Sequence, residues 1–331
     1  MTIFFDQRWD DATGIGRFCR EVKQRLPELI DMPLTGNPAA PADVLRMTWF
    51  MLRQPDSLAI SPGYNAPFFS LNRYVLTVHD LNHLDLPDNS DWRKRLYYRL
   101  ILRRACRKAA KVLTVSEFSR RRIIDWAGTS EDQVICVGNG VSEIFLQGEQ
   151  NDVSRPADDG FLFCVGNRKK HKNEKMAIAA LAALQEYPRL QLIFSGSPSD
   201  ELLREAVRLN VAPRIQFTGK LSEEQLRDYY CRAAVLVFPS RYEGFGLPAV
   251  EAMAVGCPVI ASNTTALGEI VGGAGALILP DQPWTLVSSL KVILNSPARR
   301  KELQSLGHDR ARKYSWDNVA GRIKKELSVI N

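Results

Sequence analysis

Short apolar runs, rich in β-branched and aromatic residues, alternate along the chain with longer segments of helical periodicity. This alternation is typical of parallel sheets with helices on both faces. In the first half we expect strands near residues 2–5, 74–78, 111–115 and 133–137, and in the second half near residues 161–165, 190–195, 214–218, 234–238, 257–261 and 276–279. The pattern therefore predicts an α/β protein of doubly wound units.

The length of 331 residues exceeds the usual size of one hydrophobic core, which predicts two domains. Residues 147–160 are polar, contain Pro and Gly and have no apolar period, so we place the linker there. We expect a first domain over residues 1–152 and a second over residues 153–331. Ligands of such domains bind beyond the carboxyl ends of the strands.

The six cysteines are scattered and form no Cys-x-x-Cys pair, so we expect neither a zinc site nor a disulfide framework. The first residues lack the basic and apolar regions of a secretory signal. No run approaches the ~18 apolar residues of a membrane span. These features predict a cytoplasmic protein.

A glycine-containing segment follows the strand expected at 234–238 and leads into a helix expected to begin at Pro248. Its glycines let the backbone approach a ligand, and free N–H groups at a helix start bind anionic or hydroxyl-rich groups. Glu243 precedes this helix and Glu251 lies about one turn into it, so two carboxylates flank the loop. The structural alternative is a tight turn whose Glu251 merely favours the helix dipole.

The full motif, PSRYEGFGLPAVEAMAVGCPVIAS, resembles the signature of the retaining glycosyltransferases of family 4. Further resemblances, such as NGVSEIF and FTGKLSEEQL, cover nearly the whole chain. They imply the GT-B fold, two Rossmann-like domains facing across a cleft, with a last helix at about 315–330 that packs on the first domain. By resemblance, the domain over 1–152 binds the acceptor and the domain over 153–331 binds the nucleotide-sugar donor. By resemblance, Glu243 faces the transferred sugar and Glu251 the ribose of the donor. The loop residues implied to contact the donor are Gly244, Phe245, Gly246 and Leu247.

Basic residues gather in the segment GNRKKHKN, which follows the strand at 161–165 and leads to a helix with Asn173 as its expected N-cap. The resemblance implies an Arg and a Lys here that hold the donor diphosphate. Lys172 matches the lysine, whereas either Arg168 or Asn167 fills the arginine position, and we assign Arg168. A solvated basic turn is the alternative. Gly219 and Lys220, just after another expected strand, are implied to lie near the nucleotide base.

The pair His79 and Asp80 follows the strand expected at 74–78 and resembles a dipeptide of the family's first domain. We expect His79 to form a hydrogen bond with the sugar or the phosphate, and Asp80 to orient His79 rather than act as a general base. Gly14 and Gly16 are expected in a turn that reaches the donor phosphates or the acceptor, with a plain tight turn as the alternative. No Asp-x-Asp motif occurs, so we expect no metal and no cofactor.

Twelve Lys and Arg but only one acid, Glu117, lie between Arg93 and Arg122, a net charge of +11 (12 − 1). Residues 91–108 interleave these cations with apolar side chains at helical spacing, with Trp92, Leu96, Leu100 and Ile101 on one face. Such a helix suits an anionic membrane surface, so we expect a peripheral position on the inner face of the cell membrane. A solvated helix face and nucleic-acid binding are the alternatives. The side chains assigned to this surface are Trp92, Arg93, Lys94, Arg95, Arg99, Arg103 and Arg104.

Together these features predict a hexosyltransferase that uses a nucleotide-sugar donor and retains the anomeric configuration. The chain looks most like bacterial mannosyltransferases of O-antigen or capsule assembly. That resemblance favours GDP-mannose as donor and a polyprenyl-diphosphate-linked saccharide as acceptor. A UDP-hexose donor, a GT-B nucleotide-sugar epimerase and a non-catalytic nucleotide-binding protein remain alternatives. No residue identifies the acceptor, the linkage position or the oligomeric state.

Overall fold

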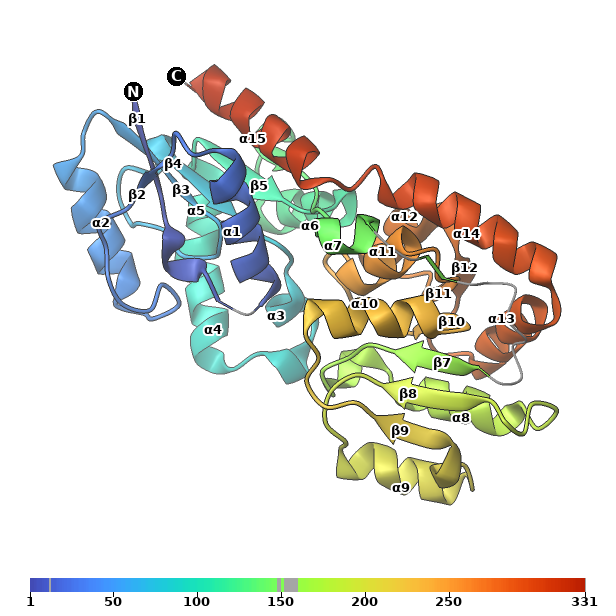
Figure 1. The fold of residues 1–331 in the computed structure, drawn as a ribbon. Helices are drawn as coiled ribbons and strands as arrows, with labels where there is room; N and C mark the ends of the chain where they lie inside the picture. The colour runs from blue at the N-terminus through green and yellow to red at the C-terminus, as the bar shows by residue number, and fades with distance from the viewer. Residues whose placement is uncertain (12, 148–149, 152–159, 331) are drawn as a thin grey trace. The chain divides into compact units, whose positions relative to one another are not determined.

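The computed structural model describes residues 1–11, 13–147, 150–151 and 160–330. The chain forms two compact units, the first of Met1–Gly140 with Ser315–Asn331 and the second of Val141–Tyr314 (Figure 1). The expected boundary at 152/153 and most of the expected linker lie outside the described residues.

The first unit contains a six-stranded parallel sheet in the order β2-β1-β3-β4-β5-β6. Its strands are β1 (Thr2–Phe5), β2 (Ile30–Asp31), β3 (Ser57–Ser61), β4 (Tyr74–Thr77), β5 (Lys111–Thr114) and β6 (Val134–Cys136). The sequence predicts four of these but neither β2 nor β3. Strand β2 is only two residues long, and β3 is a short apolar run between two serines that tertiary packing buries completely.

Helices cover both faces of this sheet because successive side chains of a strand point to opposite faces. Leu58 and Ile60 of β3 join a core with α1 and α15, whereas Ala59 joins a second core with α2 and α5. The helices are α1 (Gly14–Arg25), α2 (Asp43–Arg53), α3 (Asn82–Asp85), α4 (Trp92–Tyr97), α5 (Arg103–Lys108), α6 (Glu117–Ala127) and α15 (Trp316–Ile330). Shorter helical segments are η1 (Gln7–Trp9), η2 (Leu71–Arg73), η3 (Pro87–Asn89) and the π-helix η4 (Tyr98–Leu102).

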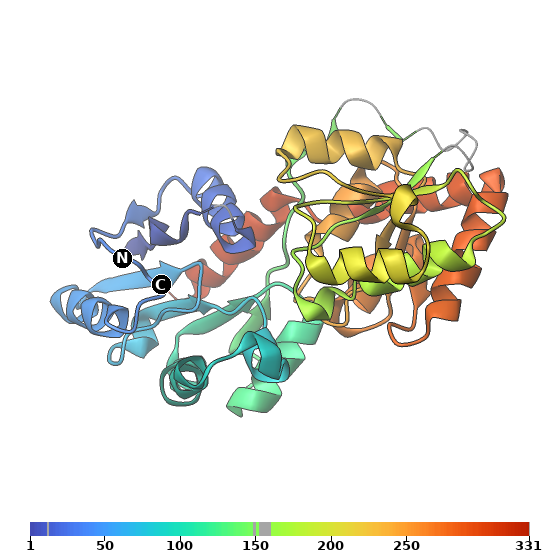
Figure 2. The same cartoon turned by 90° about the horizontal axis from the view of Figure 1, so that it is seen from below.

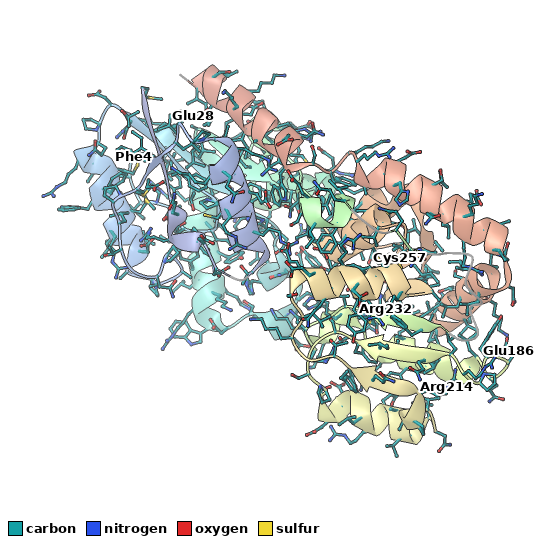
Figure 3. All side chains as sticks on the ribbon, viewed as in Figure 1. Phe4, Glu28, Glu186, Arg214, Arg232 and Cys257 are labelled. Carbon is teal, nitrogen blue, oxygen red and sulfur yellow. The ribbon has the colours of Figure 1, made fainter. Side chains whose placement is uncertain are left out.

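The last helix, α15, belongs to the first unit, as the sequence predicts. Its apolar residues recur at helical spacing, and both views of the chain show it beside α1 (Figures 1 and 2). Trp316 is buried against Phe18, and its ring also covers Gly140, where an added Cβ would lie only 2.5 Å from the indole. Glu28, which is labelled in Figure 3, forms a salt bridge with Lys324 of α15, in which Oε1 and Nζ are 3.3 Å apart.

The second unit contains another six-stranded parallel sheet, in the order β12-β11-β10-β7-β8-β9. Its strands are β7 (Phe161–Cys164), β8 (Gln191–Phe194), β9 (Ile215–Phe217), β10 (Val235–Phe238), β11 (Val259–Ser262) and β12 (Ala276–Ile278), all of which the sequence predicts. The helices are α7 (Glu143–Leu146), α8 (Lys175–Ala183), α9 (Asp200–Arg208), α10 (Glu223–Arg232), α11 (Leu247–Ala254), α12 (Thr265–Val271), α13 (Pro283–Asn295) and α14 (Pro297–Ala311), with η6 (Lys170–Lys172), η7 (Ala212–Arg214) and η8 (Gly272–Ala274). Helices α8 and α13 share a core with β7 and β8.

The strand order of each sheet reverses at one point, between β1 and β3 in the first unit and between β7 and β10 in the second. Doubly wound sheets bind ligands beyond the carboxyl ends of the strands at such a switch point. The predicted α/β architecture is therefore confirmed. Within the described part of the chain, no helix combines the length and the apolar character that a membrane span requires.

Candidate functional site

The switch point of the second unit brings together two residues that lie 71 positions apart. Lys172 ends η6, just after β7, and Glu243 follows the neighbouring strand β10. The Lys172 Nζ atom donates to Glu243 Oε1 at 2.6 Å, and the two side chains are only 14% and 13% exposed. The structure therefore joins the predicted diphosphate-binding lysine and the predicted sugar-binding glutamate in one ion pair.

Arg168 precedes Lys172 in the same segment. All three of its guanidinium nitrogens donate hydrogen bonds to other groups of the protein. Its Nε donates to the Ser197 carbonyl at 2.8 Å, one terminal nitrogen to the Ser195 carbonyl at 2.5 Å, and the other to the Glu174 carboxylate. Burial raises the pKa of the Glu174 carboxyl, and the Arg168 charge offsets this only in part. Each terminal nitrogen of Arg168 retains a second N–H. The neighbouring Asn167 is exposed.

The backbone of the 166–174 segment has unusual dihedral angles. Arg168 and Asn173 have φ of 65° and 53°, the left-handed region that few non-glycine residues adopt. Asn173 does not form the expected N-cap of α8, because Glu174 occupies that position. The Asn173 side-chain amide donates instead to the Pro280 carbonyl at 2.8 Å.

Two glycines follow the carboxyl ends of the neighbouring strands β8 and β9. Gly196 after β8 and Gly219 after β9 have φ of 80° and 72° and exchange two backbone hydrogen bonds, of 2.8 and 3.2 Å. A Cβ at Gly219 would meet no atom within 4 Å, so its backbone angle rather than space favours glycine there. The next residue, Lys220, is exposed. The Arg168 guanidinium lies close to Gly196, with its nearest nitrogen 3.6 Å from the ideal Cβ position.

The loop between the two glutamates depends on Gly246. This residue has φ of 102° and precedes α11, and an added Cβ would lie 2.5 Å from Leu267 Cδ2. The helix begins at Leu247, one residue before the predicted start at Pro248. The Phe245 ring is buried in edge-to-face contact with Tyr314, with ring centroids 5.3 Å apart.

Glu251 is 3% exposed and projects from α11. Its Oε2 accepts a hydrogen bond of 3.1 Å from the hydroxyl of the fully buried Tyr230 on α10. A buried carboxylate needs such partners, because desolvation disfavours its charged form. Tyr230 therefore supports the second glutamate of the motif.

Thr265 supports the first glutamate. Its hydroxyl accepts the backbone N–H of Glu243 at 3.0 Å, and its φ is 51° although the residue is β-branched. Such backbone angles persist only where the surrounding structure enforces them, and they cluster at functional sites.

In the first unit His79 follows β4 and is 9% exposed. Its Nε2 lies 2.8 Å from the Pro62 carbonyl, and because a carbonyl can only accept, Nε2 carries the proton. The ring also packs edge-to-face on Phe18 at 5.2 Å. Desolvation lowers the pKa of the imidazole to about 4, so the ring is neutral at pH 7 and its Nδ1 is an acceptor.

Asp80 does not orient the His79 ring as the sequence predicts, because the ring's hydrogen-bond partner among the described residues is Pro62. The Asp80 Oδ1 atom instead accepts the backbone N–H of Asn82 at 3.0 Å, at the start of α3. The Asp80 backbone N–H donates to the Tyr64 hydroxyl at 3.1 Å.

Gly14 and Gly16 form the first turn of α1, not the turn that the sequence predicts. Thr13 is the N-cap, and η1 occupies part of the longer connection from β1. Gly16 is buried, and a Cβ there would lie 2.0 Å from the Asp11 carbonyl oxygen. Close packing of the backbone thus requires a glycine at this position.

Residues 92–108, which we name the basic helix, comprise α4, η4 and α5. Trp92, Leu96 and Leu100 are 70%, 48% and 55% exposed, as the predicted face requires, whereas Ile101 packs against the core. The helix carries eight cations, and none lies within 4.0 Å of a carboxylate of the described residues: Arg93, Lys94, Arg95, Arg99, Arg103, Arg104, Arg107 and Lys108. Five of them and Leu100 line a shallow hollow.

The residues that hydrogen-bond the predicted site residues could not be identified from the sequence. Glu174, Tyr230 and Thr265 belong to no motif that marks them, and Ser195 contributes only its backbone carbonyl to Arg168. The one local signal is at residues 263–265, where Asn-Thr-Thr directly follows β11, since polar residues at a strand end favour a turn.

Comparisons with known protein families identify glycosyltransferase sequences in both halves of the chain. A family model described as glycosyl transferases group 1 matches residues 147–310, and one described as glycosyltransferase family 4 matches residues 13–143. O-antigen chain mannosyltransferase B of Escherichia coli is 28% identical over 284 residues, which cover 82% of this chain and 74% of that protein. The serotype-specific mannosyltransferase WbdA of Escherichia coli is 27% identical over 298 residues, 84% of this chain but 36% of that longer protein.

The fold also matches solved structures. HepE of Anabaena, in complex with UDP, superimposes with a TM-score of 0.79 at 19% identity over 99% of this chain and 100% of that one. The two family models together match all strands of the first sheet except β1, and every strand of the second sheet. The protein therefore belongs to glycosyltransferase family 4 and has the GT-B fold.

Proposed function

We propose that the protein transfers a mannosyl unit from GDP-mannose to a saccharide acceptor with retention of the anomeric configuration. The observation that carries this proposal is the Lys172–Glu243 ion pair at the switch point of the second unit. A leaving diphosphate requires cations, whereas sugar hydroxyls require hydrogen-bond acceptors. The pair supplies both kinds of group side by side, at the sheet edge where doubly wound domains bind nucleotides.

In the proposed reaction the bond between the sugar C1 and the diphosphate oxygen breaks. A bond from C1 to the acceptor oxygen forms on the same face, and the acceptor proton passes to an oxygen of the leaving diphosphate. Lys172, the remaining N–H groups of Arg168 and the backbone at the start of α11 stabilise the leaving charge, so the reaction needs no metal. Glu243 binds the sugar hydroxyls and Glu251 the ribose.

We assign His79 to a hydroxyl of the transferred sugar rather than to a phosphate. Its Nε2–H is bound to Pro62, which leaves Nδ1 as the acceptor. A phosphate oxygen is also an acceptor, so it would repel Nδ1, whereas a hydroxyl can donate to it. We therefore propose a sugar hydroxyl, and not a phosphate, as the partner of His79 Nδ1.

Mannose as the transferred sugar is supported by the two mannosyltransferase relatives, whereas HepE in complex with UDP supports a uridine donor as the second candidate. Thermal shifts with GDP, GDP-mannose, UDP and UDP-glucose separate them, because a bound ligand stabilises the fold by mass action. A larger shift with the UDP compounds would reject GDP-mannose.

Incubation with the preferred donor, with and without a lipid-linked saccharide, tests the reaction class. Transfer predicts nucleotide release that depends on the acceptor, together with a mannosylated product. Nucleotide release without acceptor would indicate an epimerase or a hydrolase, and binding without turnover would indicate a nucleotide-binding protein.

Lys172→Ala tests the site, with Lys169→Ala as the matched control, since Lys169 is exposed on the same segment. We expect turnover to fall about 100-fold in the first variant, the typical cost of losing a group that stabilises developing charge. The control should stay within about twofold of the wild type. Equal turnover in both variants would reject the assignment.

We further propose that the basic helix contacts an anionic membrane surface, where a lipid-linked acceptor would lie. A merely solvated helix face usually carries both signs of charge, but here eight cations have no carboxylate within 4.0 Å among the described residues. The exposed Trp92, Leu96 and Leu100 add apolar contact.

Co-sedimentation with phosphatidylglycerol vesicles should be strong at low salt and weak at high salt. Replacing Trp92, Leu96 and Leu100 with Ser should weaken it, while Leu306→Ser, an exposed residue of the second unit, should not. Binding to duplex DNA but not to vesicles would favour the nucleic-acid alternative.

A further inference from the structure

A buried ionic cluster occupies the switch point of the first unit. Arg8 donates through Nε and one terminal nitrogen to the two oxygens of Asp6, each at 2.8 Å. Its two terminal nitrogens donate to the two oxygens of Asp43, at 2.5 and 3.0 Å. Asp6 follows β1, and Asp43 begins α2. Their carboxylates are 0% and 1% exposed. Burial alone would lower the pKa of the Arg8 guanidinium, but the two carboxylates raise it overall, so the cation is retained.

Asn65, on the loop after β3, completes this cluster. Its Nδ2 donates to Asp6 and to Asp43, each at 2.9 Å. Its Oδ1 accepts from the Trp9 indole at 2.7 Å and from the Ser61 hydroxyl. Every hydrogen-bonding position of the amide therefore has a protein partner, and the cluster is not an open ligand site.

Residues 62–65, the first part of the loop between β3 and η2, also hold the His79–Asp80 dipeptide on two sides. The Pro62 carbonyl accepts the His79 Nε2–H at 2.8 Å, and the Tyr64 hydroxyl accepts the Asp80 backbone N–H at 3.1 Å. Between these two contacts Gly63 packs under the Trp9 ring, where an added Cβ would lie 2.3 Å from the indole. Residues 62–65 are therefore held by the cluster at Asn65 and contact His79 at Pro62.

Burying charges in this way is a poor source of stability, because desolvation offsets most of the attraction. A buried polar network with every member satisfied does, however, hold its parts in a single arrangement. Here the part held is the loop that sets the tautomer and orientation of His79.

We propose that Asn65, fixed by Asp6, Arg8 and Asp43, is a positioning residue that holds His79 with Nε2 as donor and Nδ1 as acceptor for the transfer reaction. This inference rests on the proposed function of His79. Asn65 and the three charged residues of the cluster would hold the His79 ring in this tautomer and orientation before any donor binds.

The test has a readout that does not depend on activity. The NMR spectrum of protein labelled with ¹⁵N-histidine contains signals from only four histidines. The signal that disappears in His79→Gln is the signal of His79. We expect a slowly exchanging Nε2–H at pH 7 in the wild type. Asn65→Ala should raise its exchange rate at least about tenfold, because the loop carrying the Pro62 carbonyl is released.

Ser57→Ala is the matched control, since Ser57 is a buried polar residue at the opposite end of β3 from the loop, and its hydroxyl donates to the Gln54 carbonyl at 2.9 Å. It should leave the His79 signal unchanged. Trp9→Phe removes the indole N–H that donates to Asn65 Oδ1 and keeps an aromatic ring over Gly63, so it provides the test if Asn65→Ala does not fold. It too should speed exchange at His79.

In the transfer assay Asn65→Ala should lower kcat about tenfold and leave the KM for the donor within about twofold, the pattern of lost positioning. Unchanged exchange at His79 in Asn65→Ala and Trp9→Phe would overturn the inference. Faster exchange with an unchanged kcat would also overturn it, while leaving the proposed function intact. If the wild type transfers no sugar, the proposed function fails, and the exchange measurement still decides whether the cluster holds His79.

Discussion

Lowering the pH from 7 to 5 should destabilise the first unit through His79. Burial lowers the pKa of this imidazole from 6.5 to about 4. Unfolding returns the ring to water and its pKa to about 6.5. Between these two values the unfolded chain binds a proton that the folded chain does not, so His79 costs no stability above pH 6.5 and an increasing amount as the pH falls toward 4.

The size of the effect follows from the difference of about 2.5 between the two pKa values. Each pKa unit is equivalent to about 1.36 kcal/mol, so the loss approaches about 3.4 kcal/mol below pH 4. At pH 5 the folded ring is still neutral while the unfolded ring is charged. The expected loss between pH 7 and pH 5 is then about 2 kcal/mol.

Tryptophan fluorescence during urea unfolding measures this loss, because five of the six tryptophans belong to the first unit and only Trp284 to the second. His79→Gln is the reference, since its amide can donate to the Pro62 carbonyl but does not titrate. Other groups titrate alike in both proteins, so their effects cancel.

The quantity to compare is the free energy of unfolding of the wild type minus that of His79→Gln. It should fall by about 2 kcal/mol between pH 7 and pH 5. A parallel loss in both proteins would show that His79 is not the buried neutral group described here.

Three further outcomes follow from close packing and burial. Gly246→Ala should destabilise the second unit by about 2–4 kcal/mol in urea unfolding followed by circular dichroism, because it combines a φ of 102° with a Cβ 2.5 Å from Leu267. Gly140→Ala should cost the first unit about 1–3 kcal/mol by tryptophan fluorescence, since the new Cβ meets the Trp316 ring. Cys106, whose thiol pKa burial raises to about 12, should resist iodoacetamide at pH 8 in the native protein, as measured by mass spectrometry.

Two glycines in open space serve as controls for these substitutions. A Cβ at Gly273 in the second unit or at Gly321 in the first would meet no atom within 4 Å. Their Ala variants should retain wild-type stability or exceed it. A cost equal to that of Gly246→Ala or Gly140→Ala would contradict the packing argument, and rapid alkylation of native Cys106 would contradict its burial.

Much of the fold was predictable because local patterns encode it. The strands of the second unit are apolar runs bounded by turn residues, and the basic helix shows its apolar face in the spacing of Trp92, Leu96 and Leu100. Strand β3 was not predictable, since its apolar run is brief and its serines become buried only when neighbouring strands pair with it. The turn expected at Gly14 was wrong because the helix start extends to that residue once Thr13 caps it.

For the site, the sequence by itself determined which groups are available. Glu243 and Glu251 belong to one linear motif, and Lys172 lies in a basic segment that follows a strand. Only the tertiary structure decided how they meet. The Lys172–Glu243 pair and the Pro62–His79 hydrogen bond each join two segments that follow strands adjacent in their sheet. Strand order depends on packing across the whole unit, so no local pattern could reveal that these residues touch.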